Sequence, residues 1–392
     1  AQGSRAPPLL GQPPGGGGCQ MNGFYGGILP SSRKAHTWRL LVELDPPGSE
    51  PFRDRVANAT YFSLHEDEFK GDECCIPFLD HLASVVARDH ERRWKKEGKR
   101  RLLGLDVGAN IGAMTPLVIE CCGSHALGGT APVHVVALEP NPANLAMLES
   151  EVQRLRRDPR FSVSVCDTVA SDSAGPVHFH VNRKKNFAGN QHGSVHRFEG
   201  EYDNEDRDVA GGDSAAFLQL PADTIDHLLW GEPSTKKQAP KSSSSTAPAP
   251  GSGSGGCSCG CGGGIAGLAL SAGFRHGATV DFVKIDTEGH EWAVLRGMSE
   301  TLRHTRFVFF EVSHLLRKAE ASVEKVVAWL EGLGFHTYRI GKKVALRISG
   351  DFYHPIYDTR LFWSNCLAVR EDEPLTEELF KPFALGRDGE AW

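Results

Sequence analysis

The chain has 392 residues, and 43 Lys and Arg against 49 Asp and Glu give a formal net charge of −6. This balance argues against a nucleic-acid partner, because proteins that bind nucleic acids tend to be basic. Hydrophobic residues make up 40% of the chain, as in globular proteins, and no apolar run reaches the roughly 18 residues that a membrane span needs. The length allows one large α/β domain or two modest ones.

Composition divides the chain into segments. The first 30 residues are rich in Gly and Pro, which predicts disorder. A serine run, alternating Ala-Pro and glycines over 231–264 predict an unstructured insertion. The expected division is a disordered segment at 1–30, a helical N-terminal cap at 31–100, the main domain at 101–370 and a tail at 371–392.

The ten cysteines are scattered or adjacent in pairs, unlike the dense framework of a small secreted domain, so most are expected to be reduced thiols. Cys257, Cys259 and Cys261 are separated by single residues, whereas structural zinc sites use wider spacings, so no metal is expected there. The chain begins at Ala1, which leaves room for an upstream targeting or anchor segment. The sequence assigns neither a compartment nor an oligomeric state.

From Arg101 onward, short apolar strands alternate with helical patterns. This alternation predicts a mostly parallel sheet with helices on both faces, and ligands of such sheets bind at the carboxyl ends of the strands. Residues 183–230 are expected to be irregular until a short helix at their end. The expected strands are Leu102–Val107, Val133–Leu138, Phe161–Val165, Val177–Val181, Val280–Ile285, Phe307–Val312, Phe335–Ile340 and Leu361–Val369. The expected helices are Phe78–Trp94, Ile111–Cys122, one opening at Pro142 with Asn141 as its N-cap, His290–Leu302 and Ser322–Leu333.

The turn after the first strand reads Asp106-Val107-Gly108-Ala109-Asn110-Ile111-Gly112. Glycines here let the backbone approach a ligand, and free N–H groups at a helix start attract an electronegative group. The pattern differs from the Gly-x-Gly-x-x-Gly of dinucleotide-binding turns, and Asp106 would repel a pyrophosphate. A sulfonium cofactor without phosphate tolerates that acid, so the turn favours S-adenosylmethionine.

Two acids follow the next strands. Glu139, after the second strand, is placed to accept hydrogen bonds from the ribose hydroxyls of an adenosine, a device that nicotinamide enzymes share. Asp167, after the third strand, either accepts from the adenine amino group or is a solvated loop acid.

The other strong feature is Val280-Asp281-Phe282-Val283-Lys284-Ile285-Asp286-Thr287-Glu288-Gly289-His290-Glu291. Its strand ends at Asp286, next to a second carboxylate and a glycine that opens a helix. By the strand count this is the fourth core strand, which places Asp286 beside the first strand and its glycine turn.

Together these motifs resemble the FkbM-type methyltransferase family, from about Arg101 to Val369. The resemblance rests on the 106–112 turn, on Leu138-Glu139-Pro140-Asn141-Pro142, on Ala170-Ser171-Asp172 with Gly175, on Lys284–Gly289 with Glu291, on Leu295-Arg296-Gly297 and on Phe310-Glu311. It implies the seven-stranded, Rossmann-like class I methyltransferase sheet with its last strand antiparallel. It also implies methyl transfer to an oxygen, often a hydroxyl of a sugar or a natural product. The chain departs from the family at His290, where a small residue is usual, and in the long insertion.

Methyl transfer requires the donor carbon to be aligned with the acceptor, and a base helps to remove the acceptor's proton. The candidate catalytic residues are Asp286, Glu288 and His290. Asp286 either acts as the base or holds the cofactor's amino group. Glu288 and Glu291 either act in the site or serve the helix N-terminus. Glu311 either binds substrate or closes the sheet.

The candidate cofactor-binding residues are Asp106, Gly108, Asn110, Gly112, Glu139, Asp167 and Asp286, and no metal ligand is assigned. The sequence therefore predicts an S-adenosylmethionine-dependent O-methyltransferase acting on a small molecule or glycan. The alternatives are a nicotinamide oxidoreductase of the Rossmann type and a non-catalytic relative that only binds cofactor.

Overall fold

The computed structural model describes residues 50–98, 100–123, 131–185, 191–196, 215–231 and 267–385. The predicted disordered segment at 1–30 lies outside these residues, as does nearly all of the predicted insertion at 231–264, so neither prediction is tested. None of the helices described over these ranges combines the length and the apolar character needed to cross a bilayer.

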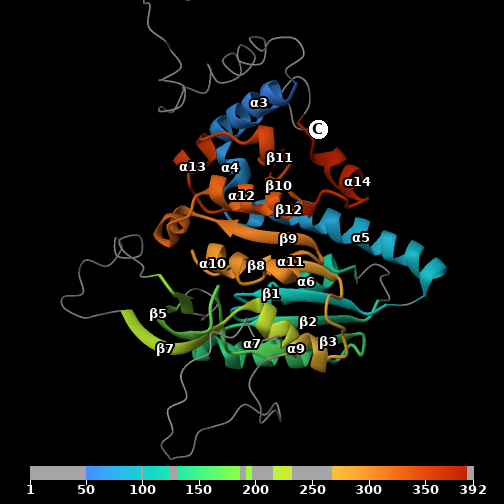
Figure 1. The fold of residues 1–392 in the computed structure, drawn as a ribbon, viewed down its shortest axis with the longest axis vertical. Coiled ribbons are helices and arrows are strands. Elements are labelled where there is room, and N and C mark those ends of the chain that lie inside the picture. Colours follow the sequence, from blue (N-terminus) through green and yellow to red (C-terminus); the bar gives the residue numbers. More distant parts are fainter. Residues whose placement is uncertain are drawn as a thin grey trace, which may run out of the picture.

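A mostly parallel sheet of eight strands forms the centre of the molecule, in the order β11-β10-β12-β9-β8-β1-β2-β3 (Figure 1). Five neighbouring strands, β9, β8, β1, β2 and β3, run parallel to one another. Strand β12 runs antiparallel to both β9 and β10. The predicted Rossmann-like α/β fold is confirmed, including the antiparallel last strand, although an eighth strand extends the expected seven. The bounds are β1 Leu102–Val107, β2 Val133–Leu138, β3 Phe161–Cys166, β8 Val280–Ile285, β9 Thr305–Val312, β10 Phe335–Ile340, β11 Ala345–Arg347 and β12 Ser364–Arg370.

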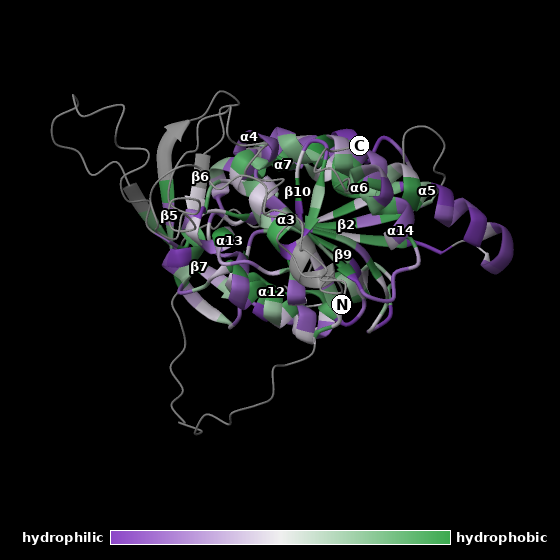
Figure 2. Ribbon diagram, turned by 90° about the horizontal axis from the view of Figure 1, so that it is seen from above, coloured by the Kyte–Doolittle hydropathy of each residue, from purple (hydrophilic) through white to green (hydrophobic). Residues whose placement is uncertain are grey.

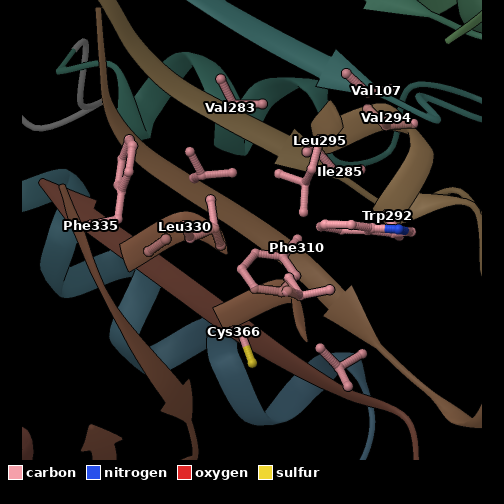
Figure 3. Packing of buried hydrophobic residues seen from close by; sticks show 14 of the residues in the cluster. Val107, Val283, Ile285, Trp292, Val294, Leu295, Phe310, Leu330, Phe335 and Cys366 are labelled. Atoms are coloured by element: carbon pink, nitrogen blue, oxygen red, sulfur yellow. The ribbon is translucent and has the colours of Figure 1, made fainter. Parts of the chain in front are cut away.

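The central strands are apolar along their whole length because helices cover both faces of the sheet. All residues of β1, β2, β8 and β9 are buried. Alternate residues point to opposite faces, so Val283 and Ile285 enter one apolar cluster while Phe282 enters the other. Figure 3 shows the first cluster, where Phe310 of β9 lies close to residues from neighbouring elements.

The helices form a layer on each face. Helices α5, α6, α7 and α14, with η1 and η4, contribute to the cluster around Phe282. The cluster around Phe310 receives side chains from α3, α4, α8, α9, α10, α11, η2, α12 and α13. The C-terminal turns of α5 are hydrophilic and extend beyond the sheet (Figure 2). The bounds are α3 Glu50–Leu64, α4 Glu66–Phe69, η1 Asp72–Cys75, α5 Ile76–Glu97, α6 Thr115–Cys121, α7 Pro142–Leu155, α8 Ile225–Trp230, α9 Leu268–Ser271, α10 Glu291–Arg296, α11 Ser299–Leu302, η2 His314–Ala319, α12 Val323–Gly332, η3 Gly350–Phe352, α13 Ile356–Thr359, α14 Thr376–Phe380 and η4 Lys381–Phe383.

Two predicted helices differ from the observed ones. The helix expected from Ile111 begins only at Thr115, because Asn110 (φ 54°) and Gly112 (φ 86°) adopt left-handed conformations that delay it. The helix expected over His290–Leu302 is two short helices, α10 and α11, separated at Gly297. By contrast, the predicted N-cap of α7 is confirmed, since the Asn141 side chain accepts a hydrogen bond from the backbone N–H of Ala143.

A second, four-stranded sheet lies beside the main one, in the order β4-β7-β5-β6. The expectation that residues 183–230 are irregular before their final helix is therefore wrong for β6 and β7. Alternation in β7, with Phe217 and Gln219 exposed and Leu218 and Leu220 half-buried, is the strand signal in that segment. The bounds are β4 Val169–Ala170, β5 Gly175–Lys185, β6 Gln191–Ser194 and β7 Ala215–Asp223.

Replacement of Gly297 tests the junction between α10 and α11. A Cβ atom at Gly297 would lie 1.8 Å from the backbone oxygen of Ser171, whereas a Cβ at Gly332 meets no atom within 4 Å. We expect Gly297→Ala to lower the free energy of unfolding by roughly 1–3 kcal/mol, because the backbones of two elements must separate. Urea denaturation with Gly332→Ala as the control measures this. Equal stability of the two variants would contradict the close contact.

Candidate active site

A cavity of about 440 Å³ lies at the carboxyl ends of the central strands, where the fold predicts a ligand site. This volume is within the range of small-molecule sites. Residues from the glycine turn, β2, the β8 turn, β9 and the second sheet share its wall. The lining residues are Gly71, Asp72, Val107, Gly108, Asn110, Leu138, Glu139, Pro140, Asn144, Thr168, Val169, Ala170, Phe179, Gly193, Val195, Asp286, Thr287, Glu288, His290, Glu311 and Trp363.

The glycine turn lies directly against the β8 turn. Gly108 has φ 75°, and a Cβ atom there would lie 1.8 Å from the backbone oxygen of Asp286. The N–H groups of Gly108 and Ala109 both donate to the backbone oxygen of Leu138, at 3.0 and 2.8 Å. Glycine is therefore required at this position both for the left-handed backbone and for the contact.

Glu139 is the polar centre of the cavity wall on the β2 side. It is 5% exposed and accepts hydrogen bonds from the backbone N–H groups of Asn110 (2.8 Å) and Asn141 (2.9 Å). Burial raises the pKa of Glu139 to about 7, although these backbone donors act in the opposite direction. Glu139 thus holds the glycine turn in place while its carboxyl group also faces the cavity.

Lys284 is buried on β8 and connects the ends of two strands. Its Nζ donates to the backbone oxygen of Gly108 (2.7 Å) and lies 3.3 Å from Asp106 Oδ1 and 3.4 Å from Asp286 Oδ2. Burial acts to lower the pKa of Lys284, but Asp286 and Asp106 outweigh burial and the net shift is upward, so the side chain stays charged. Asp106 also accepts a hydrogen bond from Thr115 Oγ1 at 2.7 Å.

Asp106 was expected to contact the cofactor, but the structure buries it completely beneath the cavity, where it neutralises Lys284. Gly112 does not line the cavity either; a Cβ there would lie 3.0 Å from atoms of Leu148 and Glu151, so Gly112 allows α7 to pack closely. Asp167 is also absent from the lining, which its neighbour Thr168 joins. Gly108, Asn110, Glu139 and Asp286 do line it.

The turn after β8 brings the three candidate catalytic residues, Asp286, Glu288 and His290, into the cavity. Glu288 has φ 53°, which is uncommon for a residue with a side chain. Glu291 is buried and its Oε1 accepts from the N–H groups of Thr287 (2.8 Å) and Gly289 (3.2 Å). Glu291 therefore fixes the turn that precedes α10, a role that was not among those considered from the sequence.

His290 is a weaker base than its residue type suggests. Burial lowers the pKa of His290 to about 4, so the imidazole is neutral at pH 7. Its Nε2 lies 3.1 Å from Ser171 Oγ, and its Nδ1 lies 3.5 Å from His196 Nε2. The side chain therefore joins the β8 turn to the loop after β4 and to the end of β6.

Glu311 lies next to Asp286. The pairing of Ile285 with Phe310 places the residues that follow them side by side. Glu311 is 5% exposed, and its Oε1 has no hydrogen-bond partner among the described residues. Burial, and then the carboxylates of Asp286 and Glu288, raise the pKa of Glu311 well above its usual range. This environment therefore favours the protonated form of Glu311.

Several lining residues were not anticipated from the sequence. Gly71 and Asp72 lie at the start of η1, just before the cap helix α5, while Phe179 lies on β5 and Val195 directly follows β6. Trp363 immediately precedes β12 and its carbonyl accepts from the N–H of Gly71 at 2.9 Å. These residues belong to no local motif, and only the folded chain brings them to the cavity.

The thiols and the ionisable side chains of the described residues give no metal centre. Six cysteines are described, all buried and free, as expected of reduced thiols: Cys74, Cys75, Cys121, Cys122, Cys166 and Cys366. In the described part of the chain, no three His, Cys, Asp or Glu side chains are grouped so that they could hold a metal ion. The predictions for Cys257, Cys259 and Cys261 fall outside that part.

Comparison with known families assigns the second half of this site. Residues 268–337 match the model of the methyltransferase FkbM domain, which confirms the resemblance to this family over those residues. The matched range contains β8, the Asp286 turn and β9 with Glu311. The fold and this match agree with a Rossmann-like methyltransferase, and residues 268–337 are similar to the FkbM domain in particular.

The other comparisons add little. No curated protein matches the chain. Among solved structures, the chain is similar to an uncharacterized superfamily protein from Burkholderia thailandensis, with 14% sequence identity over 83% of this chain and 75% of that one. The TM-score is 0.21, which is too low to establish a shared fold.

The ion pairs of Lys284 with Asp106 and Asp286, here called the Lys284 bridge, can be tested by removing the charge of Lys284. We expect Lys284→Met to lower the free energy of unfolding by about 3–5 kcal/mol, because Asp106 would be left buried without a cation. The double variant Lys284→Met, Asp106→Asn should recover part of this loss, since no unpaired buried charge remains. Urea denaturation measures both, with the exposed Lys381→Met as the control. A single variant as stable as that control would contradict the bridge.

Proposed function

We propose that the chain is an S-adenosylmethionine-dependent methyltransferase that transfers a methyl group to a hydroxyl of a sugar or small natural product. The observation that carries the proposal is one cavity that joins an adenosine-type wall, around Gly108 and Glu139, to a group of carboxyl side chains around Asp286. The match of residues 268–337 to the FkbM methyltransferase domain supports it.

The first wall suits an adenosine. Glu139 and the Gly108–Asn110 backbone stand at the ends of neighbouring strands, where a ribose would meet the carboxyl group. Apolar side chains of Leu138, Val169 and Ala170 offer a surface for a flat base. We propose that Glu139 holds the ribose hydroxyls and that Asp106 contributes indirectly, by fixing Lys284.

The second wall of the cavity, formed by the carboxyl groups around Asp286, suits a positively charged ligand. Asp286, Glu288 and Glu311 face the cavity, while Lys284 is already neutralised by Asp106 and Asp286. S-adenosylmethionine, when bound, supplies a methyl group on a positively charged sulfur and also carries an ammonium group. The residues present therefore fit this cofactor in the sign of their charge and in the apolar surface that they offer to its base.

Asp286 is the proposed base for the acceptor hydroxyl. Its side chain is 37% exposed, compared with 5% for Lys284 beside it, so it is open to an acceptor in the cavity. Glu288 remains an alternative from the same turn. We propose that His290 acts as a neutral hydrogen-bonding residue, because its low pKa makes it a poor proton acceptor.

The acceptor wall combines Phe179, Val195 and Trp363 with carboxyl groups, Asp72 among them. Flat apolar side chains beside hydrogen-bond acceptors suit the two kinds of surface of a sugar ring or a hydroxylated natural product. The same carboxyl groups disfavour a nicotinamide dinucleotide, whose pyrophosphate would be repelled by them. The oxidoreductase alternative is therefore the weaker one.

Binding of S-adenosylhomocysteine tests the proposed function directly. We expect the intact chain to bind it in titration calorimetry and to bind it more tightly than NAD. Glu139→Ala should weaken binding about 10- to 100-fold, because charge-assisted hydrogen bonds are worth roughly 1.5–3 kcal/mol. Glu149→Ala, which removes an exposed carboxylate of α7, is the matched control and should bind like the parent chain.

Two outcomes count against different parts of this proposal. If the intact chain does not bind S-adenosylhomocysteine, the cofactor assignment is wrong. If it binds and Glu139→Ala binds equally well, only the ribose assignment fails. Methyl transfer from labelled S-adenosylmethionine to a panel of sugars and hydroxylated natural products then distinguishes an active enzyme from a non-catalytic relative.

A further inference from the structure

Several carboxyl groups line the cavity close to one another. Lys284 is buried behind the Asp286 turn, and it lies within 3.4 Å of both Asp106 and Asp286. Asp72, Glu288 and Glu311 add further carboxyl groups to the same cavity. Because nearby like charges disfavour ionisation, a carboxyl group that is both buried and close to another one favours its protonated form here.

The geometry selects Glu311 as that group. It is 5% exposed, so its charged form is poorly solvated, and it follows Phe310, which pairs with the residue before Asp286. Neighbouring parallel strands lie about 5 Å apart, which is within reach of a hydrogen bond between two carboxyl groups. Its Oε1 is buried without a hydrogen-bond partner among the described residues, and Glu311 lines the cavity.

The surroundings of Glu311 reinforce this selection. The ionisable side chains that face the pair come from three directions: Asp72 and the buried Cys75 from η1, Lys284 from β8, and Glu288, His290 and Glu291 from the turn that follows. His290 is neutral at pH 7 and Lys284 is already paired. No described cation therefore offsets a charge on Glu311.

We infer that Glu311 and Asp286 form a carboxyl pair that shares one proton in the free protein and releases it when a cation enters the cavity. The inference rests on the proposed function, because it takes that cation to be the sulfonium of S-adenosylmethionine. In the step, the O–H bond of the shared carboxyl group breaks, the proton passes to the buffer, and the ligand's positive charge replaces it. Glu311 is thus a positioning residue that acts through Asp286.

The pair has a functional consequence. With the proton shared, Asp286 is a poor base, and once the proton has left, Asp286 is free to accept one from an acceptor hydroxyl. The base would therefore be fully available only in the protein that holds a positively charged methyl donor. The uncharged thioether product would favour return of the proton.

A comparison of two ligands tests the inference without turnover. S-adenosylmethionine and S-adenosylhomocysteine differ by one methyl group and one positive charge. Titration calorimetry between pH 6 and 8, in buffers of different ionisation enthalpy and without acceptor, counts the protons released by each. We expect S-adenosylmethionine to release up to about one proton more than S-adenosylhomocysteine, and its affinity to rise up to about tenfold per pH unit while the free pair is protonated.

Glu311→Gln should abolish this difference, since the amide cannot release a proton, whereas Glu377→Gln on the exposed surface of α14 should preserve it. Equal proton release by the two ligands in the parent chain would overturn the inference, and that measurement needs no variant. A difference that survives in Glu311→Gln would overturn it as well. If neither ligand binds the parent chain, the proposed function itself is wrong. If both bind with equal proton release, only the inference that Glu311 and Asp286 share a proton is wrong.

Discussion

The site depends on one interaction, the charge of Lys284 held between the ends of β1 and β8. Its Nζ contacts Asp106, Asp286 and the backbone oxygen of Gly108, so a single buried cation connects the glycine turn to the acidic turn. Without it, two carboxylates would face each other across adjacent strands. Beside this cation, Gly108 passes so close to the Asp286 backbone that no Cβ atom would fit.

The acidic residues near Lys284 have two different roles. Asp106 and Glu291 are fully enclosed and serve the two turns, the first through Lys284 and the second through backbone N–H groups. Asp286 and Glu311, by contrast, line the cavity. Asp106 and Glu291 thus have their partners within the protein, whereas the proposed function gives the two cavity acids a positively charged ligand as their partner.

The sequence predicted the central sheet well because each central strand is apolar throughout and ends at a recognisable turn. It placed Asp286 beside the glycine turn, which the pairing of β1 with β8 confirms. It could not show that Asp106 points beneath the cavity, because burial depends on Lys284 from a strand almost 180 residues away. It also missed the strand character of β7, whose partner β5 precedes it across a long connection.

The residues of the proposed acceptor wall were not identified from the sequence for the same reason. Phe179 lies on β5, Val195 directly follows β6, and Trp363 lies in the segment before β12. Yet the second sheet is not independent of the chemistry, because Ser194 Oγ donates to the backbone oxygen of Glu288 at 2.7 Å and His196 contacts His290. These contacts connect the second sheet, which contributes to the proposed acceptor wall, to the turn that carries the proposed base.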